Sequence, residues 1–126
     1  MKISRLDHLV ITTADLERCL HFYVEILGME LDRRDGRYAV RFGSQKFNIH
    51  CRPAEFEPAA RHPTYGSQDI CLIAEGKIED IRAELEEKGC PIELGVVERT
   101  GALGLMDSIY IRDPDENLVE ISVYKQ

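Results

Sequence analysis

The stretch IYIRDPDENLVEISVY, residues 109–124, combines two short apolar segments with a polar turn between them. The Asp-Pro-Asp sequence at 113–115 is typical of a tight turn, because proline presets the backbone angle of the position it occupies. In the segment that follows, side chains alternate between the two faces of a predicted strand. Val119, Ile121 and Val123 therefore share one face, and Glu120 lies on the other with Leu118, Ser122 and Tyr124. This position for a carboxylate is typical either of a solvent-facing side chain or of one that points into a polar cleft.

The bulk properties of the chain are those of a globular protein of one domain. It has 126 residues, a net charge of −7 and a pI near 5.1, which argue against a nucleic-acid partner. No segment approaches the ~18 apolar residues of a membrane span, so no membrane partner is expected. The N-terminal residues MKISRLDHLV resemble a strand, and the four cysteines lack CxxC spacing. We therefore expect reduced thiols and a cytoplasmic location.

The chain contains an internal repeat. His8 precedes Gly28 by 20 residues, and Asp69 precedes Gly89 by 20, so both landmarks are displaced by 61 positions (69 − 8 and 89 − 28). Each interval begins with a strand pattern and continues as an amphipathic helix that ends at the glycine. In the first half, Thr13 is the expected N-cap of the helix. A repeat of this length predicts two copies of one supersecondary unit.

Each copy is predicted to have the order strand, helix, three strands. Asp35-Gly36 is a strong hairpin signal within the first copy. The predicted strands of the first copy are 6–12, 29–33, 38–42 and 47–51, and those of the second are 69–74, 92–97, 109–112 and 118–124, with its helix at 77–88. The proline- and alanine-rich segment 52–67 is the expected connector.

Strand alternation places potential metal ligands on one face. If the helices cover the face of Ile11, Phe47 and Val119, polar side chains gather on the opposite face. These side chains are His8, Asn48, His50, Asp69 and Glu120. A set of two histidines and one carboxylate with an open position suits a divalent metal such as Zn, Ni, Mn or Fe(II).

Three segments resemble the vicinal oxygen chelate superfamily, which includes glyoxalases, bleomycin-resistance proteins and extradiol dioxygenases. They are LDHLVITTADLERCLHFYVEILGM, FGSQKFNIH and RTGALGLMDSIYIRDPDENLVEIS. The resemblance covers nearly the whole chain and is closest to glyoxalase-domain proteins. It implies an α+β fold in which two βαβββ modules form a curved mixed sheet around a cleft, with helices on the outer face. Residues 1–126 would be one such domain, with module one at about 3–52, a connector at about 53–67 and module two at about 68–125.

The resemblance also implies which residues bind the metal. His8 matches the first-strand histidine of the family, and Glu120 matches the last-strand glutamate. Asp69 stands where metal-dependent members usually have histidine. Two alignments compete for the remaining position, one with Asn48 and one with His50 opposite Glu120. Because imidazole binds transition metals better than an amide does, we predict His8, His50 and Glu120 as ligands, with Asp69 as the alternate.

Residues 98–107 are expected to form a loop beside the cleft. Gly101 and Gly104 would make it mobile, and Arg99 could recognise an anionic group of a substrate. A plain surface connector is the alternative. Tyr110 and Tyr124 are expected to line the cleft together with Asn48, which is a substrate-binding candidate.

The function that the resemblance implies is that of a glyoxalase-like, metal-dependent lyase or isomerase. Its small-molecule substrate would be chelated through adjacent oxygens, and Glu120 would be both a ligand and the catalytic base. The alternatives are an extradiol-type dioxygenase with Fe(II) and a non-catalytic, antibiotic-type binding protein. A homodimer is expected, because two modules leave open sheet edges for a partner.

Overall fold

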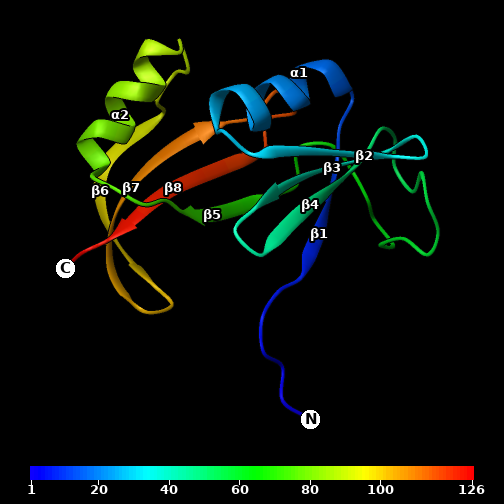
Figure 1. Cartoon of the computed structure of the whole chain (residues 1–126), viewed down its shortest axis with the longest axis horizontal. Helices are drawn as coiled ribbons and strands as arrows, with labels where there is room; N and C mark the ends of the chain where they lie inside the picture. Colours follow the sequence, from blue (N-terminus) through cyan, green and yellow to red (C-terminus); the bar gives the residue numbers. More distant parts are fainter. The chain divides into compact units, whose positions relative to one another are not determined.

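Both halves of the chain have the order strand, helix, three strands (Figure 1). The computed structural model describes residues 1–126 and divides into two units, Met1–Gly66 and Ser67–Gln126. The first unit contains β1 (His8–Thr12), α1 (Leu16–Leu20), the π-helical segment η1 (His21–Ile26), β2 (Glu30–Arg34), β3 (Arg37–Phe42) and β4 (Gln45–His50). The second contains β5 (Asp69–Ile73), α2 (Ile78–Glu87), β6 (Leu94–Gly101), β7 (Gly104–Arg112) and β8 (Leu118–Tyr124). The predicted α+β class and the two βαβββ modules are confirmed.

Each unit has one mixed sheet of four strands. The strand orders are β1-β4-β3-β2 and β5-β8-β7-β6. In both sheets the first strand pairs in parallel with the last strand of its unit, and the other neighbours are antiparallel. The same topology therefore recurs in the two halves, as the 61-residue repeat predicts.

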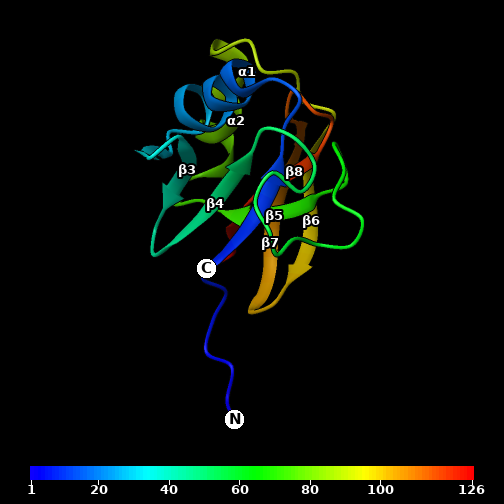
Figure 2. The same cartoon turned by 90° about the vertical axis from the view of Figure 1, so that its right-hand side faces the viewer.

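In the first unit, the helical segment covers the apolar face of the sheet. Tyr23 of η1 is fully buried, and its ring meets that of Phe47 on β4 edge-on, with ring centroids 5.8 Å apart. Ile11 and Ile49 are buried as well, since they have the same parity as Phe47. Figure 2 shows α1 against this sheet, and the residues before β1 extend away from it.

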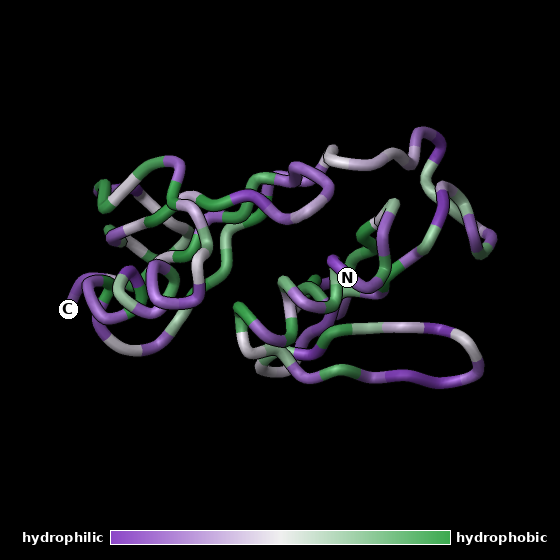
Figure 3. The backbone as a smooth tube through the Cα atoms, turned by 90° about the horizontal axis from the view of Figure 1, so that it is seen from above, coloured by the Kyte–Doolittle hydropathy of each residue, from purple (hydrophilic) through white to green (hydrophobic).

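The second unit has the same layering. Ile78 and Leu85 of α2 are buried, as are Val119 and Ile121 of β8, whereas Glu79 and its acidic neighbours on the helix are exposed. Figure 3 shows hydrophobic and hydrophilic residues alternating along the chain in both units. This alternation buries one face of each sheet and leaves polar side chains on the other.

No helix has the length and apolar character needed to cross a membrane.

The first helix begins two residues later than predicted. The Asp15 carboxylate accepts a hydrogen bond from the backbone N–H of Arg18 at 3.1 Å, which makes Asp15 the N-cap. Thr13 instead accepts one from the backbone N–H of Asp15 at 3.2 Å. The Thr13 prediction was wrong because Asp and Thr are both good caps, and two lie close together here. Gly28 ends the helical segment at φ +76, as predicted.

The prediction of a loop at 98–107 was also wrong. Glu98 pairs with Asp107, and Thr100 pairs with Leu105, so β6 and β7 form a hairpin that continues through this segment. The last pair of the hairpin is Gly101 with Gly104, so only residues 102 and 103 form the turn. The glycines therefore serve a tight hairpin turn, one of them at φ +139, and neither a mobile loop nor a plain surface connector describes the segment.

Candidate functional site

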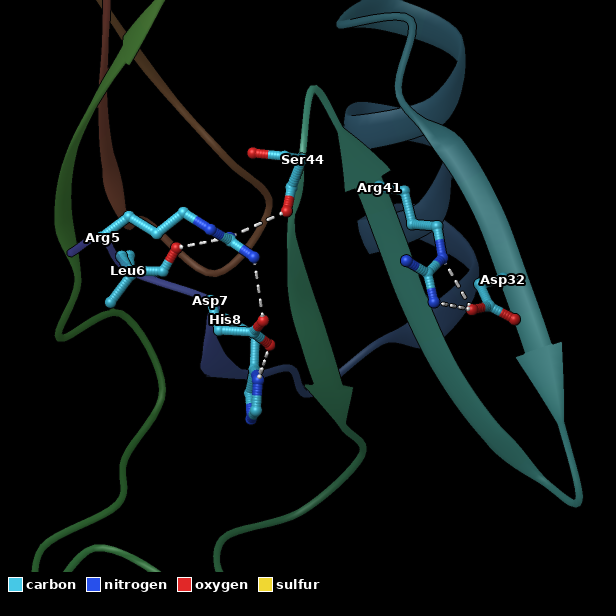
Figure 4. Close-up of polar contacts among 7 residues, drawn as sticks. All are labelled: Arg5, Leu6, Asp7, His8, Asp32, Arg41 and Ser44. Atoms are coloured by element: carbon cyan, nitrogen blue, oxygen red, sulfur yellow. Dashed lines mark hydrogen bonds and ion pairs between the residues drawn. The ribbon is translucent and has the colours of Figure 1, made fainter.

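His8 is an exposed histidine whose ring is held by a neighbouring carboxylate. Its Nδ1 lies 2.8 Å from Oδ2 of Asp7, and Arg5 lies 3.5 Å from the other oxygen of Asp7 (Figure 4). Arg5 also donates to the carbonyl oxygens of Leu6 and Ser44, both at 3.1 Å. The hydrogen bond from His8 and the charge of Arg5 hold the pKa of the Asp7 carboxyl below its usual value. This arrangement directs Nδ1–H at Asp7 and leaves Nε2 available to bind a metal.

His50 is half-buried at the end of β4. Its ring meets that of Phe56 edge-on, with centroids 5.2 Å apart. Burial lowers the pKa of His50, and the nearby Arg37 acts in the same direction, while Glu55 opposes them. The imidazole is therefore neutral near pH 7, which is the form that binds metals.

The strand register decides between the two alignments for the position opposite Glu120. In the first unit Val10 pairs with Asn48, and in the second Cys71 pairs with Glu120. Val10 and Cys71 are related by the 61-residue offset, so Asn48 occupies the repeat position of Glu120. His50 lies on the same face, two residues further along β4.

Glu120 lies in the middle of the polar face of the second sheet. Tyr110 is directly opposite it on β7, and Cys71 is directly opposite on β5. The Ser122 hydroxyl donates to Oε2 of Glu120 at 3.2 Å and lies 2.7 Å from the buried Ser108 hydroxyl. No basic side chain forms an ion pair with Glu120, so its carboxylate keeps its ligand capacity.

The other predicted residues of this unit lie on the same face as Glu120. Arg99 donates from Nε to the Tyr110 hydroxyl at 3.0 Å, and the Tyr124 hydroxyl accepts the backbone N–H of Leu103 at 3.1 Å. Arg99, Glu120 and Tyr124 line one pocket of about 360 Å³ within the second unit. The structure thus brings together four predicted residues: Arg99, Tyr110, Glu120 and Tyr124.

The hydroxyl pair beside Glu120 was not predicted. Cys71 Sγ lies 3.3 Å from Ser122 Oγ, and burial raises the pKa of the Cys71 thiol. Ser122 could have been predicted to lie beside Glu120, because residues two positions apart in a strand point to the same face. The register that brings Ser108 opposite Ser122 is a non-local property that the sequence pattern alone did not show.

Asp69 is the exposed first residue of β5, opposite Leu118, and shares the polar face with Cys71. It occupies the repeat position of His8. His8 and Glu120 have the donor chemistry of divalent-metal ligands, and so does Asp69. Within either unit, however, no three His, Cys, Asp or Glu side chains come together as a metal site. These residues therefore fit a divalent metal by side-chain type alone.

Comparison with known families identifies the family of the protein. Residues 5–121, which include most of the polar face of each sheet, match the family described as "Glyoxalase/Bleomycin resistance protein/Dioxygenase superfamily". The protein belongs to this superfamily. It is 49% identical over 125 residues to "Virulence protein STM3117" of Salmonella typhimurium, covering 98% of this chain and 87% of that protein. It is 46% identical over 126 residues to "Glyoxalase domain-containing protein RDO1" of Mycosarcoma maydis, covering 99% of this chain and 71% of that protein.

Solved structures agree with this assignment. The crystal structure of STM3117 matches with a TM-score of 0.95 at 48% identity, covering 99% of this chain and 100% of that one. A lactoylglutathione lyase from Agrobacterium tumefaciens matches with a TM-score of 0.75 at 24% identity, covering 98% and 96%. TnmS3, an antibiotic binding protein from a Streptomyces species, matches with a TM-score of 0.76 at 20% identity, covering 99% of each chain. At these last two identities, the likeness concerns the fold alone.

Proposed function

We propose that this protein is a glyoxalase-like, metal-dependent lyase or isomerase that acts on a small substrate chelated through adjacent oxygens. The main structural support for this proposal is the hydrogen bond between Asp7 and His8. A carboxylate on one ring nitrogen is the usual outer-shell partner of a metal-binding histidine, because it fixes the tautomer and makes the ligand more basic. Membership of a superfamily that commonly uses divalent metals supports the same proposal.

The proposed ligands are His8, His50 and Glu120, with Asp69 as the alternate to His50. His8 offers Nε2, and Glu120 offers a carboxylate that no cation neutralises. The metal would be Zn, Ni, Mn or Fe(II), which accept mixed imidazole and carboxylate ligands. When bound, it would supply Lewis-acid stabilisation of negative charge on the substrate oxygens.

The chain's own groups would position the substrate and move the proton. Glu120 is the proposed base, and the Ser122 hydroxyl holds Oε2 so that Oε1 can take up a substrate proton. Arg99 uses Nε to bond Tyr110 and Nη1 to bond the carbonyl of Glu98, so its remaining nitrogen can bind an anionic substrate group. Tyr110, Tyr124 and Asn48 are proposed to contact the substrate.

A non-catalytic, antibiotic-type binding protein is the second candidate. Asp69 favours it, because this position usually holds a histidine in the metal-dependent relatives, and because no three ligands assemble within either unit. An extradiol-type dioxygenase is a third candidate, and it would require His50 as the second histidine of an Fe(II) site. The pocket lined by Arg99, Glu120 and Tyr124 could bind a small molecule in any of the three cases.

Turnover assays test the proposal. The protein is loaded with each of the four metals and offered methylglyoxal–thiol hemithioacetals and catechols. We expect isomerisation of a hemithioacetal with at least one metal, and a loss of at least about 100-fold in Glu120→Gln. Glu98→Gln, on the neighbouring hairpin, is the matched control and should retain activity. Catechol cleavage with Fe(II) would favour the dioxygenase, and ligand binding without turnover on any metal would favour the binding protein.

We also propose that the two units form one vicinal oxygen chelate domain and that the protein is a homodimer. Edge strands such as β2 and β6 could pair with a second copy. Light scattering after size-exclusion chromatography should give about twice the 14.4 kDa of the chain, and a mass of one chain would contradict the dimer. The four free cysteines support a reducing, cytoplasmic location.

A further inference from the structure

The net negative charge of the protein is confined to its second unit. Residues 1–66 contain ten Lys and Arg against nine Asp and Glu, a net charge of +1. Residues 67–126 contain six Lys and Arg against fourteen Asp and Glu, a net charge of −8. The first unit is thus basic relative to the rest of the chain.

These basic residues gather on the polar face of the first sheet. Arg34 and Arg37 are directly opposite each other on β2 and β3, and Arg41 is directly opposite Lys46 on β3 and β4. Like charges at directly opposed positions destabilise an antiparallel pair. Two such pairs on one face place four cations close together, an arrangement that attracts an anion.

Part of this positive charge is neutralised within the sheet. Asp32 accepts from Arg34 at 3.2 Å and from Arg41 at 2.8 Å, and both interactions lower the pKa of its carboxyl, that of Arg41 the more strongly. Arg37 and Lys46 have no such partner, since neither forms an ion pair. Two cations on this face are therefore available to a ligand.

An aromatic side chain orients the first of these cations. The guanidinium carbon of Arg37 lies 4.0 Å from the ring centroid of Phe56, a close cation–π contact. Phe56 belongs to the connector, which is tied to the end of β4 where the Glu55 carboxylate accepts the backbone N–H of Cys51 at 2.8 Å. This contact fixes one face of the guanidinium and leaves its N–H edges free to bind a carboxylate in a bidentate manner.

Arg37, Lys46, Asn48 and Phe56 line one pocket of about 230 Å³ that lies wholly within the first unit. Asp32 and Asp35 also line it, the first neutralised as above and the second at the hairpin turn. We propose that this pocket binds the carboxylate of a small organic anion. Arg37 and Lys46 supply the charge, the Asn48 amide supplies a further donor, and Phe56 forms an apolar wall. This deepens the proposed function and rests on it, because it assigns the substrate class as small organic carboxylates.

Direct binding to metal-free protein tests this pocket separately from the metal. In EDTA and at low ionic strength, the full chain is titrated with benzoate and with its neutral analogue benzamide, followed by NMR. We expect saturable benzoate binding, no saturation by benzamide at the same concentrations, and binding at least about tenfold weaker in Arg37→Gln. The matched control is Arg33→Gln, because Arg33 lies over Tyr38 on the other face of the same hairpin. It should bind benzoate within about twofold of the wild-type protein.

The pocket would be wrongly assigned if benzoate fails to bind, or if Arg37→Gln and Arg33→Gln weaken binding equally. Inorganic phosphate binding as tightly as benzoate would also overturn the assignment, since it would show a general anion patch. Because Arg37 is exposed and lies opposite the like charge of Arg34, Arg37→Gln should melt no lower than the wild-type protein, which separates loss of binding from loss of fold. Turnover that fails in the assays above while benzoate still binds through Arg37 would overturn the enzyme proposal and leave the pocket standing.

Discussion

Asn117 shows how one buried side chain holds the polar turn before β8. Its relative exposure is 1%, and its Nδ2 donates to Oδ2 of Asp113 at 2.7 Å. Its Oδ1 accepts the backbone N–H of Gln68 at 2.8 Å, which ties the start of the second unit to the start of β8. The turn was predictable from Asp-Pro-Asp, but this second contact joins residues 49 positions apart and was not.

Replacing Asn117 with alanine should therefore destabilise the protein by about 2–3 kcal/mol, because the Asp113 carboxylate and the backbone N–H of Gln68 each lose a hydrogen bond. Asn48→Ala is the control: Asn48 is half-buried without a side-chain hydrogen bond, so we expect a change within about 0.5 kcal/mol. Urea denaturation of the two variants measures the difference. Equal stability losses would show that the Asn117 contacts contribute nothing specific.

Gly95 is a position where no side chain fits. Its φ is +129, and an added Cβ would lie 2.7 Å from the backbone oxygen of Ser108. Gly104 has a similar φ of +139 but nothing within 4 Å. Gly95→Ala should therefore be less stable than Gly104→Ala by at least about 1 kcal/mol, since only the first adds a backbone clash to the strain. Thermal unfolding of the two variants provides the test, and equal melting temperatures would contradict it.

At the scale of elements, the hairpin of β2 and β3 depends on an ionised carboxylate. Hydrogen bonds and charge from Arg41 and Arg34 lower the pKa of Asp32 relative to the unfolded chain. A lowered pKa contributes stability above the unfolded value of about 3.9, and that contribution is lost as the pH falls through the lower folded value.

Asp32→Asn should consequently be less stable than wild type at pH 7, and the difference should shrink as the pH is lowered below about 4. Chemical denaturation between pH 7 and pH 2.5 measures it, with the exposed turn residue Asp35→Asn as the control. A stability difference that stays constant with pH would contradict the role given to Asp32.

The element patterns that were predictable are local ones. Period-two alternation placed Glu120 and Tyr124 on the polar face, and Asp35-Gly36 marked the first hairpin correctly, since both depend on neighbouring residues alone. The segment at 98–107 was not predictable in this way, because its strands are stabilised by pairing with each other and with β8. The choice of Asn48 over His50 as the repeat partner of Glu120 likewise required the register of β1 and β4.

At the scale of the whole molecule, the duplication explains how two similar units come to carry different polar faces. The repeat position of His8 is Asp69, and that of Asn48 is Glu120. The first unit thus holds histidine and basic residues, and the second holds carboxylates and Arg99. Family membership was predictable from the sequence because the segments that carry it are continuous, whereas the proposed ligands His8 and Glu120 are over a hundred positions apart.

We propose above that His8 and Glu120 are ligands of a divalent metal. The most direct measurement is a calorimetric titration of EDTA-treated, dialysed protein with Zn²⁺, in the wild type and in His8→Ala, Glu120→Ala and the control His62→Ala. His62 is exposed in the connector and lies outside both polar faces. We predict about one metal per chain in the wild type and in His62→Ala, and affinity at least about 100-fold lower in each of the other two variants. A folded wild-type protein that binds no divalent metal, or equal affinity in all four proteins, would contradict the claim.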